Sequence, residues 1–390
     1  MRSSIFTCFI AAFLALTFLS GCAVIPFEKT SEYTKDLYRR IQYKLEGDHR
    51  VLNIFYATTR AKEDDRLTPG SFNSTLGKGI SYGTLDAKID PSLKIGAITP
   101  TQLTKAGLID VKNMTTLDDA EFLKKLSDAV AASPHNSLMV MVFGYEQNFE
   151  DAAINAAFFS YLLDINTPVL LFDWPGDQPP SVPGYAKAQS YAISSGPHLG
   201  ELLTKIVHQI KPNKLWITAH SMGCQVVCDA FDDMYKNPAL ADADAEIDHV
   251  ILAAPDVGQN EFDEKFKNEL AAMSKKLTAY VSSDDQALLM SGVINQEERL
   301  GRIKDSKEHK QLEELKGLLY VKSLGSDKIA VIDVTPINNS TFRHGYYLES
   351  PEFYDDFYLR IFDKGPNVNR RLYLIKFKDN IDYWVLNSGK

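Results

Sequence analysis

The chain has 390 residues, of which 45% are hydrophobic and 24% charged, and its formal net charge at pH 7 is −9. Such a length and composition are typical of a globular protein with one large core. The negative charge argues against extensive contact with a nucleic-acid backbone, which needs many Lys and Arg side chains to release counterions. We therefore expect no nucleic-acid partner.

Residues 1–21 have the pattern of a signal peptide, with a positive start and an apolar run at 5–18 that is short for a membrane span. The run leads into LSGC, which is similar to a bacterial lipobox and ends at Cys22. We expect cleavage before Cys22 and attachment of several fatty-acyl chains such as palmitate, because one chain anchors only marginally. Since Ala23 is not the aspartate that retains many such lipoproteins in the inner membrane, we expect an outer-membrane anchor facing the periplasm. The alternative is an ordinary signal peptide.

Residues 22–50 predict a lipidated tether followed by a short helix. Apolar residues recur every four positions from Tyr33 to Leu45, and Gly47 ends the pattern. We expect this helix to dock on the protein body rather than on a membrane.

Residues 51–362 predict an α/β domain. Strands are expected at 53–58 and 80–89, separated by a polar loop at 60–78, and a helix at 117–130. From there, strands alternate with helices. The strands are predicted at 137–143, 168–174, 214–219, 249–254, 277–282 and 329–334, and the helices at 150–163, 185–210, 223–235 and 261–274. Because the strands are apolar with little alternation, they predict a mostly parallel, doubly wound sheet flanked by helices.

Three further segments lie outside this alternation. The proline-rich residues 177–184 follow the carboxyl end of a strand, where open α/β sheets place ligands. Residues 295–327 are charged and predict either a lid or an exposed excursion. Residues 363–390 alternate apolar and polar side chains around a polar turn at 378–380, which predicts a C-terminal hairpin extension.

The stretch LWITAHSMG at 215–223 contains the strongest functional signal. An apolar run breaks at small-x-Ser-x-Gly around Ser221 and continues as a helical pattern. This strand, turn and helix are the context of a nucleophile elbow. The helix that follows presents free N–H groups and a positive dipole end to a developing oxyanion. We predict Ser221 as the nucleophile.

A nucleophilic serine needs a base, usually histidine. His344 lies on a loop beyond the last core strand, where an α/β hydrolase carries its base, although an exposed loop histidine is the alternative. His220 should point to the opposite side of the elbow and have a structural role. The other six lie in polar loops, on a helix, at a strand start or in a charged stretch: His49, His135, His198, His208, His249 and His309.

The orienting acid should follow a strand between the serine and the histidine. Asp284 and Asp285 both follow the predicted strand 277–282, and we favour Asp285, while spacing alone leaves Asp284 open. Asp256 follows the preceding strand but is also placed to cap the next helix. Asp333 lies in the final strand and is interpreted as a hydrogen-bonding residue near His344.

Two backbone N–H groups are expected to form the oxyanion hole. One belongs to Met222, and the other to Tyr145, in the Gly144-Tyr145 pair that follows a strand. Cys224 and Cys228 stand four apart on one helix face, a poor disulfide geometry, and no further metal ligands are near. We therefore predict buried cysteines, no metal and no organic cofactor.

Taken together, these residues resemble a bacterial family of α/β-hydrolase-fold proteins of the esterase/lipase type. The resemblance covers residues 51–362 and follows motifs in order: FYATTR, SYG, FGYEQNFEDAA, FDWPG, AHSMG, LAAPDV, YVSSDDQALLMS, RLG and VIDV. It implies Ser221 as nucleophile, Asp285 as acid and His344 as base. Members usually have His-Gly-Tyr-Asn where this chain has FGYE at 143–146, and often Arg at position 286, which here is Gln.

The resulting hypothesis is a lipid-anchored serine hydrolase, a carboxylesterase or lipase-like enzyme. It would cleave an ester-type small molecule or lipid through an acyl-enzyme. The membrane would be a partner through Cys22, and the sequence carries no signal for an oligomeric state. The alternative is a non-catalytic envelope lipoprotein that uses the fold as a binding or scaffolding module.

Overall fold

The chain divides into two units, residues 1–42 and 43–390, and the second contains the helices and strands described below. The computed structural model describes residues 41, 43–64, 66–93, 106–237, 247–302, 328–362, 371–376 and 382–388. The predicted signal peptide lies outside these residues, as do 303–327 of the predicted lid. Within them, no helix combines the length and apolarity that crossing a membrane requires.

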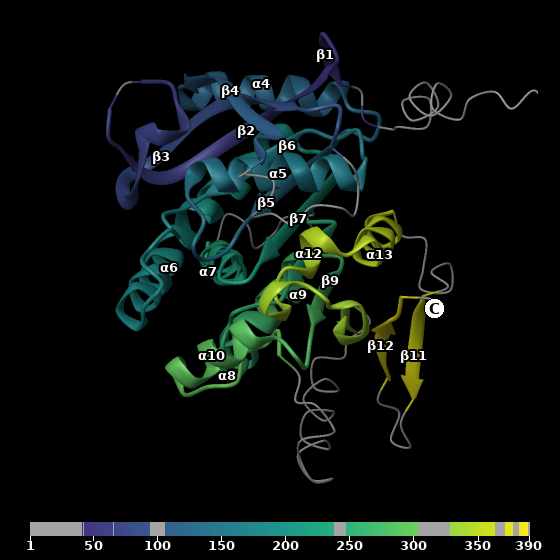
Figure 1. The fold of residues 1–390 in the computed structure, drawn as a ribbon. Coiled ribbons are helices and arrows are strands. Elements are labelled where there is room, and N and C mark those ends of the chain that lie inside the picture. Colours follow the sequence, from purple (N-terminus) through teal and green to yellow (C-terminus); the bar gives the residue numbers. More distant parts are fainter. Residues whose placement is uncertain are drawn as a thin grey trace, which may run out of the picture. The chain divides into compact units, whose positions relative to one another are not determined.

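One sheet runs through the second unit (Figure 1). Its strand order is β11-β12-β10-β9-β8-β7-β5-β6-β2-β3-β4, and β1 pairs with β2. Neighbours from β2 to β12 in this order are parallel, while β1, β3, β4 and β11 add antiparallel pairs. The strands are β1 Lys44–Glu46, β2 His49–Lys62, β3 Phe72–Ile89, β4 Ile109–Leu117, β5 Ser137–Val142, β6 Val169–Asp173, β7 Lys214–His220, β8 His249–Ala253, β9 Leu277–Val281, β10 Ile329–Asp333, β11 Leu372–Lys376 and β12 Asp382–Leu386.

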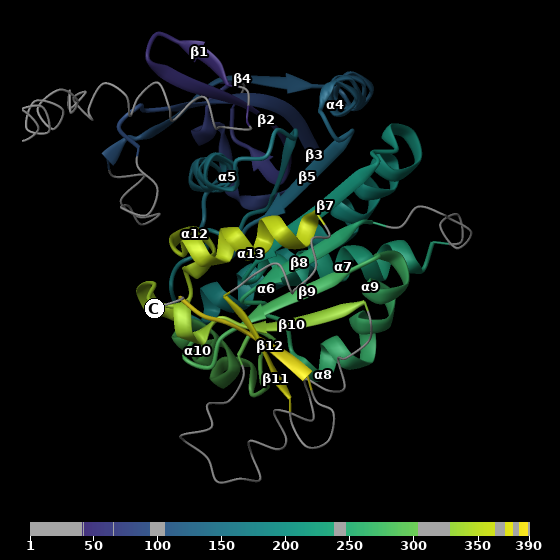
Figure 2. The ribbon, with the colours of Figure 1, turned by 90° about the vertical axis from the view of Figure 1, so that its right-hand side faces the viewer.

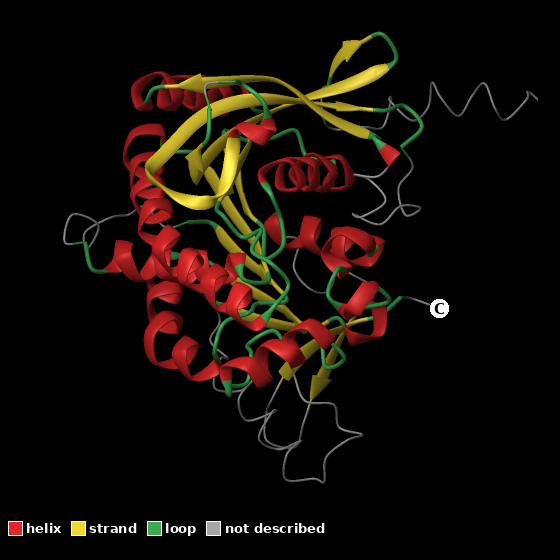
Figure 3. Ribbon diagram, turned by 60° about the vertical axis from the view of Figure 1, so that its left-hand side comes forward, coloured by secondary structure: helices red, strands yellow, loops and turns green. Residues whose placement is uncertain are grey.

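Helices cover both faces of the sheet, as Figures 2 and 3 show. One apolar cluster joins the sheet to α4, α6, α7 and α9, and a second joins the other face to α5, α12 and α13. The α-helices are α4 Asp119–Ala132, α5 Phe149–Leu163, α6 Val182–Lys205, α7 Gly223–Tyr235, α8 Gln259–Glu261, α9 Lys267–Met273, α10 Gln286–Asn295, α12 Tyr346–Glu349 and α13 Pro351–Ile361. Short 3-10 or π turns are η1 Pro69–Ser71, η2 Ile206–Ile210, η4 Phe262–Phe266, η5 Thr335–Ile337 and η6 Thr341–Arg343.

The central strands are buried on both sides, which explains their lack of polar alternation. In β5, Val140 packs in the first cluster and its neighbours Met139 and Met141 in the second. Successive side chains of a strand point to opposite faces, so a strand covered twice must be apolar throughout. The prediction of a mostly parallel sheet with flanking helices is therefore confirmed.

Two local predictions are wrong. Residues 60–78 are not one polar loop, because β2 continues to Lys62 and β3 begins at Phe72, with register shifts that break the alternation. Leu45 is not helical, since it lies in β1 opposite Arg50. The pairing of β11 with β12 is antiparallel, as expected of the C-terminal hairpin, and β12 also joins β10 in the main sheet.

Candidate active site

Ser221 occupies a sharp turn between β7 and α7. Its φ is +55°, in the left-handed region that is costly for a residue with a side chain. The turn is held from two sides, because Ser221 N donates to Ala253 O at 3.0 Å and Asp256 N donates to Ser221 O at 3.2 Å. The helix that follows starts at Gly223. This is the geometry of a nucleophile elbow.

Two glycines allow β5 and the elbow to approach each other. A Cβ on Gly223 would lie 2.5 Å from the carbonyl oxygen of Phe143. A Cβ on Gly144 would lie 2.7 Å from Ser221 Cβ and 3.2 Å from Ser221 Oγ. The loop after β5 therefore touches the serine, and no larger residue fits at either glycine without a backbone shift.

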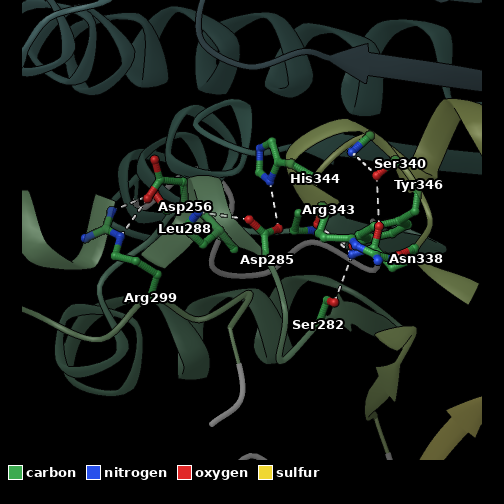
Figure 4. A network of polar contacts seen from close by, with 12 residues as sticks. Asp256, Ser282, Asp285, Leu288, Arg299, Asn338, Ser340, Arg343, His344 and Tyr346 are labelled. Carbon is green, nitrogen blue, oxygen red and sulfur yellow. Dashed lines mark hydrogen bonds and ion pairs between the residues drawn. The ribbon is translucent and has the colours of Figure 1, made fainter. Parts of the chain in front are cut away.

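The base and acid predicted from the sequence lie in contact. His344 Nδ1 and Asp285 Oδ2 are 2.7 Å apart, and Asp285 is fully buried (Figure 4). The other carboxylate oxygen, Oδ1, accepts from Leu288 N at 2.9 Å and so caps α10. Because both oxygens are engaged, the carboxylate is fixed in orientation, and so is the imidazole that it holds.

Burial and charge act on the pKa of His344 in opposite directions. Burial lowers it, while the charge of Asp285, its hydrogen bond and the more distant charge of Asp256 raise it, leaving the pKa above the ordinary value of 6.5. The imidazole is therefore protonated at a higher pH than a free histidine. A base that works in its neutral form loses activity as the pH falls through this raised pKa.

A side-chain network holds the loop that carries His344. Asn338 Nδ2 donates to Ser282 Oγ at 2.9 Å and to Arg343 O at 2.6 Å. Ser340 Oγ donates to Asn338 Oδ1 and accepts from Gly345 N, both at 2.8 Å. Figure 4 shows this chain of contacts between the end of β9 and the histidine loop. The loop conformation is thus tied to the strand that also leads into Asp285.

His220 contacts His344, the proposed base. Its Nε2 lies 3.1 Å from the carbonyl oxygen of His344, and its ring stacks on Tyr347 at a centroid distance of 3.7 Å. Burial, followed by the proximity of His344, lowers the pKa of His220 well below 6.5, so the ring stays neutral and Nε2–H is the donor. The structural role is as predicted, but the ring lies beside His344 rather than on the opposite side of the elbow.

The rival acids are engaged elsewhere. Asp284 accepts from Ser282 Oγ at 2.6 Å and lies 3.8 Å from Arg343. Asp333 accepts from Thr335 N at 2.8 Å. Neither contacts the His344 ring, so of the residues that follow β9 and β10 only Asp285 is in a position to orient it.

Asp256 belongs to a separate buried cluster beside the site. It pairs with Arg299 Nε at 2.7 Å and accepts from Tyr185 Oη at 2.8 Å and from Ser291 Oγ at 2.5 Å. The interpretation of Asp256 as a helix cap is wrong, because α8 is preceded by Gly258 and has no side-chain cap. The pairing compensates a buried charge, and Asp256 N also supports the elbow.

The two expected oxyanion donors remain available. Within the described part of the chain, no hydrogen bond engages the backbone N–H of Tyr145 or Met222. The Tyr145 hydroxyl donates to Pro179 O at 2.6 Å, which fixes the loop after β5 to the proline-rich loop. Phe143, directly after β5, is buried in the second apolar cluster, and its ring lies 6.1 Å from that of Tyr347.

Sequence reasoning missed one buried ionic cluster. The side chain of Arg60 is fully buried, pairs with Asp173 at 2.8 Å and Asp177 at 2.5 Å, and donates to Gln147 O at 2.7 Å. Burial lowers the pKa of Arg60, but the two carboxylates more than reverse this, so it is charged. The cluster joins β2 and β6 to the loops after β5 and β6. An arginine directly after the strand run FYATT was the available signal.

The two cysteines of α7 are buried, as predicted. Cys224 and Cys228 are free and buried, and burial raises the pKa of both thiols well above the ordinary value. Such thiols are unreactive. Among the residues that the structure describes, no group of His, Cys, Asp and Glu is arranged to hold a metal ion.

Comparison with known proteins places the chain in a family. A search of curated proteins gives no match. An uncharacterised protein from Capnocytophaga ochracea DSM 7271 aligns with a TM-score of 0.30 and 9% identity, over 71% of this chain and 60% of that one, so this chain spans well under two thirds of its length. Esterase B from Lactobacillus rhamnosis aligns at 0.29 and 9%, over 87% and 96%. A lipase-esterase related protein from Clostridium acetobutylicum ATCC 824 aligns at 0.23 and 12%, over 56% and 82%. A family model described as alpha/beta hydrolase of unknown function (DUF900) matches residues 118–360, more than half of the chain, which therefore belongs to this family.

Proposed function

We propose that this protein is a serine hydrolase that cleaves carboxylic esters through Ser221, His344 and Asp285. The observation that carries the proposal is the 2.7 Å contact between His344 Nδ1 and the buried Asp285, on a loop that also contacts the residue preceding Ser221. With Nδ1–H donating to the carboxylate, Nε2 is left as the basic nitrogen. The family membership supports hydrolysis as the reaction type.

In the first half-reaction, Ser221 Oγ attacks the ester carbonyl carbon while His344 Nε2 takes its proton. The carbonyl oxygen becomes an oxyanion and accepts from the N–H groups of Met222 and Tyr145. The intermediate collapses, the bond to the alcohol oxygen breaks, and the imidazolium returns its proton to that oxygen. Asp285 stabilises the imidazolium while it exists.

In the second half-reaction, His344 removes a proton from water, whose oxygen attacks the acyl carbon. The ester bond to Ser221 then breaks, the serine regains its proton from the imidazolium and the carboxylic acid leaves. These residues suffice for both steps in the proposed mechanism.

The test is labelling of the folded protein by a fluorophosphonate, which reacts only with an activated serine. We expect labelling of the parent chain and none with Ser221→Ala or His344→Ala, whereas His208→Ala is the matched histidine control and retains labelling. Turnover of p-nitrophenyl butyrate should follow the same pattern. If the folded parent chain is not labelled, the hydrolase proposal fails and the non-catalytic binding module takes its place.

We also propose that Cys22 is lipidated and anchors the protein to the outer membrane, facing the periplasm. The LSGC sequence after an apolar run supports this. Mass spectrometry of the protein extracted from membranes should show a chain that starts at an acylated Cys22. The Cys22→Ala variant should no longer be acylated. An unmodified Cys22 in the parent chain would contradict the proposal.

A further inference from the structure

Exposed apolar side chains gather beside the candidate site. Of the large hydrophobic residues that are exposed in the described part of the chain, five belong to three neighbouring segments: Val182, Leu289, Met290, Val293 and Phe342. We call these five the apolar surface. The other exposed ones are scattered over different elements, and single exposed apolar residues need no explanation.

The three segments are joined by contacts. Tyr185, one turn after Val182 in α6, has its hydroxyl 2.8 Å from Ser291 Oγ in α10. Asn295, at the end of α10, donates to the same hydroxyl at 3.2 Å. Helix α10 also contacts η6, which carries Phe342 two residues before His344. The apolar surface is therefore built around the helix that Asp285 caps.

Helix α10 is unusual for a surface helix. Its sequence QALLMSGVIN contains no charged residue, in a chain in which 24% of residues are charged. Leu289, Met290 and Val293 follow the i, i+1, i+4 spacing that places side chains on one face, and that face is open to water. Folding gains little from these three side chains.

Phe342 is a further part of the apolar surface that does not stabilise the fold. Its φ is +54°, a region that strongly disfavours bulky residues, and 67% of its surface is exposed. The strained backbone destabilises the folded protein, and the exposed ring gains little burial energy that could offset the strain. An outlier of this kind beside a candidate site is a reason to look for a function that the ring serves.

We propose that the apolar surface docks on a phospholipid bilayer and inserts Met290, Val293 and Phe342 among the lipids. Contiguous exposed apolar patches mark interaction sites, and lipid is the partner that the N-terminal sequence indicates. Only 20 residues separate the proposed anchor at Cys22 from Tyr43, so an acylated chain would hold the body beside a bilayer.

The charges on and near the apolar surface indicate whether it would bind zwitterionic or anionic lipid. Helix α10 offers no cation, and Arg343 beside Phe342 already lies 3.8 Å from the Asp284 carboxylate. The chain also carries a net charge of −9, so anionic lipid gives little electrostatic gain. Docking therefore depends on apolar insertion alone, into zwitterionic lipid and independently of salt. If the proposed function holds, the esters cleaved are drawn from the bilayer itself rather than from water.

The test is hydroxyl-radical footprinting, read residue by residue by mass spectrometry, with phosphatidylcholine vesicles. The protein is the chain from residue 23 on, so that neither an acyl chain nor the apolar run at 5–18 mediates binding. We expect vesicles to reduce modification of Met290 and Phe342 at least five-fold, while the exposed Tyr235, at the far end of α7, changes less than 1.5-fold. Adding phosphatidylglycerol or 0.5 M KCl should leave these ratios unchanged.

A double variant checks that the apolar surface causes the protection. Val293→Ser with Phe342→Asn should bring the protection of Met290 below two-fold, and asparagine tolerates the positive φ at position 342. Ile193→Ser, an exposed apolar position further along α6, should leave the protection intact. If the double variant does not fold, the footprint of Met290 and Phe342 in the parent chain still decides the proposal.

Three results would overturn docking. Equal changes at Met290 and Tyr235 would show general radical scavenging by lipid. Protection of Met290 without lipid, growing with protein concentration, would show that a second copy of the chain covers the surface. Protection only with anionic lipid would show an electrostatic contact instead. Fluorophosphonate labelling of Ser221 in the same samples reports separately on the proposed hydrolase activity, so either proposal can fail alone.

Discussion

Replacing Gly144 with alanine tests the oxyanion hole without changing any proposed catalytic side chain. The added Cβ would lie 2.7 Å from Ser221 Cβ, 3.0 Å from His220 O and 3.2 Å from Ser221 Oγ. Since the first distance is below normal contact and the elbow is held by two backbone hydrogen bonds, the loop of Tyr145 must move. A displacement near 1 Å of a positioned group costs about 10²-fold in rate, and loss of one oxyanion donor about 10²–10³-fold.

We therefore expect Gly144→Ala to lower kcat for p-nitrophenyl butyrate by about 10²–10³-fold with a small change in KM. The overpacking should destabilise the fold by about 1–3 kcal/mol, measured by urea denaturation. Gly79→Ala is the matched control, because its Cβ would meet no atom within 4 Å, and it should keep full activity. A Gly144→Ala enzyme within three-fold of the parent kcat would refute the placement of Tyr145 N–H over the serine.

Three other predictions follow from the same site. Asp285→Asn should lower kcat by about 10⁴-fold, because the amide no longer holds the productive tautomer of the imidazole. The parent kcat/KM should fall on the acid side through a pKa above 6.5, and Asp256→Asn should move this limb to lower pH, because it removes a charge that raises the pKa of His344. Arg60→Met should destabilise the fold by about 3–5 kcal/mol in urea, because it leaves the buried Asp173 carboxylate of β6 without an opposite charge, although Thr58 Oγ1 still donates to it.

Each of these has a matched control or an opposing outcome. Asp284→Asn should stay within three-fold of the parent kcat, and a loss equal to that of Asp285→Asn would reopen the choice of acid. An acid limb that does not move in Asp256→Asn would remove the proposed charge effect. Arg66→Met changes an arginine at the surface and should leave the urea midpoint in place. An equal loss in both arginine variants would contradict the role assigned to burial.

The elements that could be predicted from the sequence are those in which a single physical constraint sets the types of residue along the chain. Buried parallel strands must be apolar on both faces, so runs such as 137–143 were recognisable, and the small residues around Ser221 indicated the elbow. The family resemblance then separated Asp285 from Asp284. The contact of Asp285 with His344 agrees with that choice, while its catalytic role awaits the variants proposed for it.

What was missed depends on tertiary contacts. The part of the β2–β3 pair at 60–78 has register shifts and mixed burial, so no regular period predicts it. Arg60 was assigned to the predicted polar loop at 60–78 because its partners Asp173 and Asp177 are more than 100 residues away. His220 was placed on the wrong side because its stacking on Tyr347 joins residues 127 positions apart in the sequence. Distant pairings of this kind leave no local signal.

The two carboxylate oxygens of Asp285 have different partners, and this links the proposed catalysis to the local stability of α10. One oxygen holds the imidazole and the other closes the first turn of the helix through Leu288 N. Any event that reorients the carboxylate toward one partner weakens its hold on the other, so opening of the helix start and loss of the aligned base are a single motion. The exchange rate of the Leu288 amide with deuterated solvent therefore reports on the base without any substrate or inhibitor. The need for one carboxylate to reach both partners also explains why glutamate, which is one methylene longer, would be a poor substitute although it carries the same charge.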